Sequence, residues 1–79
     1  MSGNNAFCRI VEQLAVLSTT KGGFTKEVNI VSWNEANPKL DIRIWLPNHQ
    51  RAFSGLTFTE DEGYQLYQAL EKLYKDYKP

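Results

Sequence analysis

Residues 24–45 read FTKEVNIVSWNEANPKLDIRIW, and this stretch predicts two β-strands joined by a short polar loop. The second strand, 39–46, alternates in hydrophobicity at every position. One face carries Leu40, Ile42, Ile44 and Leu46, and the other carries Lys39, Asp41, Arg43 and Trp45. Successive side chains of a strand point to opposite faces of its sheet. We therefore expect an apolar face that packs and a polar face that holds both cations and a tryptophan.

The first strand of this pair, 24–33, follows the same rule. Val28 and Ile30 point one way, and Trp33 shares the other face with Glu27 and Asn29. Trp33 and Trp45 then lie on adjoining strands with Arg43 between them, and Phe24 and Phe53 could extend the cluster. Aromatic rings among cations are typical of surfaces that stack the bases of a single-stranded nucleic acid. The competing interpretation is that both tryptophans belong to the core.

Cations near this surface are candidates for phosphate contacts: Lys21, Lys26, Lys39, Arg43 and Arg51. By parity Lys26 falls on the face of Val28 and Ile30. The simpler interpretation of these cations is a solvated strand face, on which Arg43 pairs with Asp41 or Glu27 for little gain in stability.

The rest of the chain predicts two further strands and a helix. Residues 7–18 favour a strand that is apolar on both faces, although Ile10, Leu14 and Leu17 also fit the apolar stripe of a helix. The glycine-containing TTKGG at 19–23 predicts a turn, and 47–50 predicts another before a fourth strand at 51–58. We expect residues 1–6 to be disordered and 7–79 to form one domain. This order of elements is an α+β plan with a four-stranded antiparallel sheet and one C-terminal helix.

The helix is predicted to begin at a capping box, Thr59-Glu60-Asp61-Glu62, and to run to about Tyr77. Its apolar stripe is wide, so we expect its leucines to meet the sheet and its tyrosines to meet a second subunit. A 79-residue chain has room for only a thin core. A symmetric homodimer whose interface includes Tyr67, Leu70 and Tyr74 would bury the excess apolar surface.

Composition narrows the class of protein. The net charge is zero, which is unusual for a nucleic-acid-binding protein. However, residues 21–51 carry an excess of two positive charges and residues 59–79 an excess of two negative charges, and the local field is what a ligand meets. One cysteine permits no internal disulfide, so we expect a cytoplasmic protein, associated with the nucleoid if bacterial, without a signal peptide or membrane helix.

The sequence offers little for catalysis. Cys8 and His49 are the single thiol and the single imidazole, and a nucleophile pair made from them is a remote alternative. One histidine and one cysteine do not provide the spacing of a metal site. We therefore expect no enzyme, no cofactor, no metal and no small-molecule substrate.

The run GGFTKEVNIVSWNEANPKLDIRIWLPNHQRAFSGLTFTEDEGYQLYQAL resembles the transcriptional positive cofactor four family of single-stranded-DNA-binding coactivators, and most of all its small bacterial members of the YdbC type. The resemblance covers about residues 10–72. It is carried by LDIR at 40–43 followed by Trp45, by GLTFTEDE at 55–62, and by the order of the strands.

This resemblance implies a curved antiparallel ββββα fold, a homodimer, and single strands bound with little sequence preference. It implies stacking roles for Trp33 and Trp45 and phosphate contacts by Lys26 and Arg43. The chain departs from the family just before the glycine of the fourth strand, where Ser54 stands in place of a basic residue that is often found at this position. We expect a single-stranded DNA-binding protein of transcription, replication or repair. RNA binding on the same surface and a protein-interaction module that uses the tryptophans are the alternatives.

Overall fold

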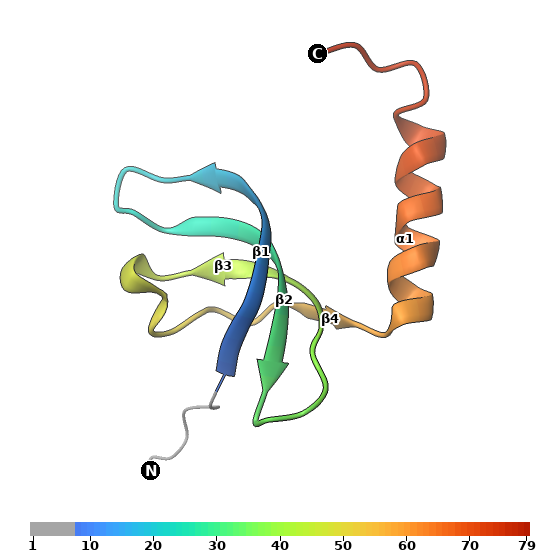
Figure 1. Ribbon diagram of the computed structural model, residues 1–79. Helices are drawn as coiled ribbons and strands as arrows, with labels where there is room; N and C mark the ends of the chain where they lie inside the picture. Colours follow the sequence, from blue (N-terminus) through green and yellow to red (C-terminus); the bar gives the residue numbers. More distant parts are fainter. Residues whose placement is uncertain (1–7) are drawn as a thin grey trace.

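The computed structural model describes residues 8–79 and contains one four-stranded antiparallel sheet followed by one helix (Figure 1). The strands lie in the spatial order β1-β2-β3-β4. The elements are β1 (Cys8–Thr19), β2 (Thr25–Trp33), β3 (Lys39–Trp45), the 3-10 helix η1 (Pro47–His49), β4 (Leu56–Phe58) and α1 (Glu60–Leu73). The predicted α+β class and ββββα order are confirmed. The prediction of disorder at 1–6 lies outside the described residues.

The N-terminal segment is a strand, which decides between the two interpretations left open by its pattern. β1 pairs with β2 from Cys8↔Trp33 to Thr19↔Thr25. Its register shifts three times, once after Ile10, once after Gln13 and once after Val16. Extra residues of this kind bend a strand and increase its twist. β1 therefore curves strongly along the sheet, as Figure 1 shows.

The sheet is concave on the face that carries the two tryptophans. Trp45 is paired with Thr25 at one end of β2, and Trp33 lies at the other end, so the two are about eight residues, or about 26 Å, apart along a flat sheet. Nevertheless their ring centroids are 6.3 Å apart. Strong curvature is required to bring them together. We call this face, with Glu27, Asp41 and their neighbours, the concave face.

The buried interior of the described chain lies on the concave face. Val31 and Trp45 are its buried apolar residues, and Glu27, Asn29 and Asp41 are buried beside them. The opposite, convex face is apolar but only half-buried at Ile30, Leu40 and Ile42. The polar face predicted from alternation is thus the covered one, because the sheet curls around it.

The fourth strand is shorter than the predicted 51–58. Ile42↔Leu56 and Trp45↔Ala52 are both paired, so three residues, 53–55, oppose two residues of β3. An extra residue interrupts a ladder in this way at a bulge. Gly55 lies against β3 so closely that a Cβ built on it would be 2.3 Å from the Arg43 Cβ.

The start of α1 is as predicted. The Thr59 hydroxyl accepts from the Glu62 amide and the Glu62 carboxylate accepts from the Thr59 amide, which completes the capping box. The predicted end at Tyr77 is wrong, because α1 ends at Leu73 and Tyr74 leaves helical geometry.

The prediction that the helix packs its leucines on its own sheet is wrong for Leu70 and Leu73, which are 44% and 68% exposed, whereas Leu66 is half-buried. The start of the helix lies close to the sheet, since a Cβ built on Gly63 would be 3.2 Å from Leu40 Cδ2. Thr59, in extended conformation directly after the three residues of β4, turns the helix away from the sheet (Figure 1).

Gly55→Ala should destabilise the fold by about 1–3 kcal/mol, because the added methyl overlaps the Arg43 side chain and the Ile42 carbonyl oxygen at 2.5 Å. Urea unfolding measures this change. Gly22→Ala is the matched control, since a Cβ there would meet only the Phe24 ring at an ordinary 3.4 Å. Equal midpoints for the two variants would contradict the close approach at Gly55.

Candidate nucleic-acid interface

Glu27 is a heavily hydrogen-bonded side chain of the concave face. Its carboxylate accepts from Thr25 Oγ1 at 2.6 Å, Asn29 Nδ2 at 2.9 Å and Gln13 Nε2 at 3.1 Å. His49 Nε2 lies 2.6 Å from Oε2, the same oxygen that accepts from Thr25. Burial by itself would raise the pKa of Glu27, but the hydrogen bonds from Thr25, Asn29, His49 and Gln13 outweigh it and lower the pKa to about 2. Glu27 is therefore an anion held inside the curve of the sheet.

Asp41 is the second buried carboxylate, and it positions the aromatic cluster. Arg43 donates to both of its oxygens at 2.7 Å, which is a bidentate charge-assisted pair. Trp33 Nε1 donates to the same carboxylate at 3.1 Å, and the Thr57 hydroxyl donates at 3.0 Å. One carboxylate from β3 thus fixes side chains from β2, β3 and β4.

Arg43 and Trp33 form a stacked unit. The guanidinium carbon lies 4.4 Å from the centroid of the Trp33 ring, within the range of a cation–π contact. The Trp33 ring stays partly exposed while Asp41 holds its edge. Asp41 therefore fixes both the edge of the Trp33 ring and the guanidinium that lies over this ring.

Trp45 is on the predicted face but is not exposed. It is 1% exposed and stacks on Trp33 with an interplanar angle of 11°. The centroids of the Trp45 and His49 rings are 5.7 Å apart. The expectation that Trp45 offers an open stacking surface is therefore corrected. Strand parity assigns a residue to a face, but it does not reveal that curvature and the loop after β3 cover this part of the face.

Phe24 and Phe53 form a second stack, with ring centroids 5.9 Å apart and planes within 5°. Phe53 is 52% exposed, and its carbonyl oxygen accepts from Arg43 Nη1 at 3.3 Å. Arg43 therefore links the two aromatic pairs.

The remaining candidate cations, Lys21, Lys26, Lys39 and Arg51, are exposed. Lys26 is paired with Ile44, so it lies on the convex side as parity predicted. Arg43 differs from all of them because its charge is largely engaged by Asp41.

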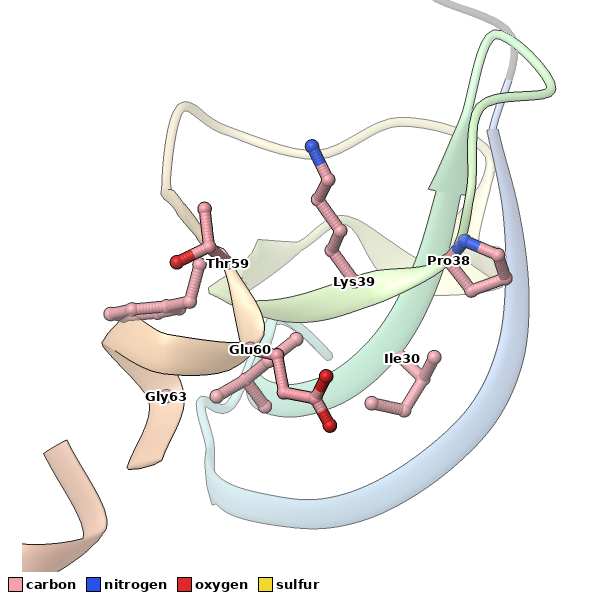
Figure 2. A pocket seen from close by; sticks show the side chains of 8 residues that line it. Ile30, Pro38, Lys39, Thr59, Glu60 and Gly63 are labelled. Carbon is pink, nitrogen blue, oxygen red and sulfur yellow. The ribbon is translucent and has the colours of Figure 1, made fainter. Parts of the chain in front are cut away.

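An apolar hollow of about 460 Å³ lies on the opposite side of β3, between the sheet and the start of α1. Ile30, Leu40 and Phe58 line it together with Pro38, Glu60 and Gly63. Figure 2 shows the Lys39 amine directed away from this hollow. The predicted interface residues are all exposed: Tyr67 and Leu70 on α1, and Tyr74 directly after it.

The structure does not bring together Cys8 and His49, the two residues of the alternative nucleophile pair. His49 bonds Glu27, whereas Cys8 is paired with Trp33 at the other end of β2. Burial raises the pKa of the Cys8 thiol, which disfavours the reactive thiolate. Within residues 8–79, no three metal-ligating side chains gather at one point, and no helix has the length and apolar character to cross a membrane.

Comparison with known proteins gives one informative match. No family model matches the chain. An uncharacterized protein of Treponema pallidum (strain Nichols) is 34% identical over 53 residues, which cover 67% of this chain. The chain aligns with 62% of that protein, less than two thirds of its length.

Sequence reasoning missed the two carboxylates and the histidine. Glu27 and Asp41 were interpreted as weak surface partners of Arg43, yet both are 0% exposed. The available signal was their position: each sits mid-strand on the face of a tryptophan. His49 was assigned to a turn, which is correct, but no local pattern indicates that this turn folds back over Trp45.

The depressed pKa of Glu27 predicts loss of stability in acid. A carboxyl group whose folded-state pKa lies below its ordinary 4.5 stabilises the fold above that pH, and this contribution disappears as the pH falls from about 4.5 to about 2. Protonation of the buried Glu27 should lower the free energy of unfolding by about 3 kcal/mol. Urea unfolding at fixed protein concentration measures it. Glu27→Gln should flatten the pH dependence, whereas Glu12→Gln, at an exposed position of β1, should leave it steep.

Proposed function

We propose that this chain is a homodimeric single-stranded DNA-binding protein with little sequence specificity. The observation that carries the proposal is the Trp33–Arg43 unit, in which a partly exposed indole is held by a buried carboxylate with a guanidinium 4.4 Å from its ring. A preorganised ring loses little freedom when a base stacks on it. The resemblance to the positive cofactor four family supports the same function.

In this proposal the aromatic and cationic residues have separate tasks. Bases stack on Trp33 and on the exposed Phe53 of the second stack, while Arg43 keeps the Trp33 ring in place and joins the two stacks through the Phe53 carbonyl. Phosphates meet the exposed Lys21, Lys39 and Arg51, and Lys26 from the convex side of β2. Duplex DNA binds more weakly because its bases are already stacked on one another.

The dimer is supported by the apolar surface that a single copy leaves open. Val11, Leu14, Val16 and Leu17 of β1 are about half-exposed, as are the tyrosines and leucines of α1. The helix of the same chain covers little of the convex face and its hollow, which it meets at Glu60 and Gly63. A second copy, related by a two-fold axis, would cover these surfaces with Tyr67, Leu70 and Tyr74 at the interface.

Trp33→Ala should weaken binding of an oligo-dT of about twenty nucleotides by about 1–3 kcal/mol, because one stacked base is lost. Quenching of tryptophan emission and fluorescence anisotropy measure the affinity, with a duplex of equal length and an oligo-U as comparison ligands. Equal affinity for the duplex would remove base stacking from the proposal, and a preference for oligo-U would favour RNA as the ligand.

Salt dependence distinguishes the cations. Lys39→Ala should lower the slope of log K against log salt by about 0.7, the value for one single-strand phosphate contact. Arg43→Ala should reduce affinity with less change in slope, because Asp41 already engages its charge. Lys78→Ala removes the same charge from the C-terminal tail and is the matched control.

The dimer has its own test. Light scattering at micromolar concentration should give twice the chain mass of 9.1 kDa. Leu70→Asp should shift the protein toward monomer, because it places a charge in an apolar interface. Glu71→Asp, one residue away on α1, is the control. A monomeric wild-type protein under these conditions would defeat the dimer.

A further inference from the structure

The segment after β3 covers Trp45 through one side chain. The His49 ring lies 5.7 Å from the Trp45 ring at an angle of 38°, and its Nε2 lies 2.6 Å from the buried Glu27 carboxylate. The imidazole itself is 41% exposed. His49 thus lies at the surface with its ring against Trp45, whose other aromatic neighbour is Trp33.

The backbone of this cover is held in an unfavourable conformation. Asn48 and His49 have φ values of 76° and 58° in succession, and neither is glycine. Side chains of L-residues rarely adopt this region. The segment also rests against the turn before β2, where a Cβ on Gly23 would meet Pro47 at 3.2 Å. The side-chain contacts of His49 therefore stabilise a segment whose backbone favours other conformations.

Two buried polar atoms beneath the cover lack partners. Trp45 Nε1 and Asn29 Oδ1 make no hydrogen bond among the described residues, although both are fully enclosed. Buried polar groups are almost always paired. The closed arrangement therefore leaves two buried polar atoms unsatisfied next to Trp45 and Glu27, which disfavours it relative to an arrangement in which they are paired.

We propose that His49 is a latch that closes a second base-stacking position on Trp45, and that a single strand opens it by displacing the imidazole. The inference rests on the proposed function for its ligand, but the latch itself is a property of the free protein. In the closed state Trp33 and Phe53 provide the accessible rings. In the open state a base takes the place of the imidazole and Trp45 becomes part of the binding surface.

The latch is tested first without nucleic acid. In a Trp33→Phe background Trp45 is the single tryptophan, and acrylamide quenching of its emission reports its exposure. His49→Ala should increase the quenching constant relative to wild type, because it removes both the ring beside Trp45 and the hydrogen bond to Glu27. His49→Gln keeps a hydrogen-bond donor for Glu27 without the ring, and its quenching constant should lie between those of wild type and His49→Ala. Gln50→Ala, at an exposed neighbour, is the control.

The second measurement adds oligo-dT to the same His49 variants with Trp33 intact. His49→Ala should bind roughly tenfold more tightly than wild type, which is the order expected from loss of one charge-assisted hydrogen bond. Unchanged protection of Trp45 in His49→Ala would overturn the latch. Equal oligo-dT affinity in wild type and His49→Ala would overturn its role in binding. Increased exposure of Trp45 with no oligo-dT binding by any variant would support the latch and reject the proposed function.

Discussion

Two buried carboxylates determine how this small sheet is built. Glu27 and Asp41 lie on the inside of the curve, and each is compensated by hydrogen bonds from several strands. A charge in such a place is tolerated only when its partners are in position. Gln13 from β1, Thr57 from β4 and Arg43 from β3 are therefore tied to one arrangement of the sheet. This network also fixes the positions of the aromatic side chains, because Asp41 accepts hydrogen bonds from both Trp33 and the Arg43 guanidinium.

The polar interior has a consequence for the apolar residues. In most small α+β domains the helix covers the apolar face of the sheet, but here α1 leaves the sheet after Thr59, and Leu70 and Leu73 remain exposed. Within residues 8–79, the convex face of β2 and β3 and the stripe of α1 are thus two largely uncovered apolar surfaces. In the proposed dimer folding and association are coupled, so that stability depends on protein concentration. The two faces of one sheet would serve different purposes, ligand on the concave side and subunit on the convex side.

Local sequence rules predicted the elements that depend on neighbouring residues. The alternation in 39–46 placed every residue of β3 on its correct face, and the capping box set the start of α1. The failures all involve contacts between distant segments. The curvature that buries Trp45 arises from register shifts in β1, the short β4 arises from the extra residue near Gly55, and the cover over Trp45 comes from His49. None of these leaves a periodic signal in the sequence.

The three register shifts in β1 also bear on solubility. β1 is an edge strand of twelve residues with exposed valines and leucines. A long, straight, apolar edge of this kind is a template for unlimited strand addition and hence for fibrils. Each shift interrupts the regular row of donors and acceptors that an incoming strand would need, and the bend moves successive parts of the edge out of one plane. The same irregularities that fold the sheet around its concave face therefore protect the chain from edge-to-edge aggregation.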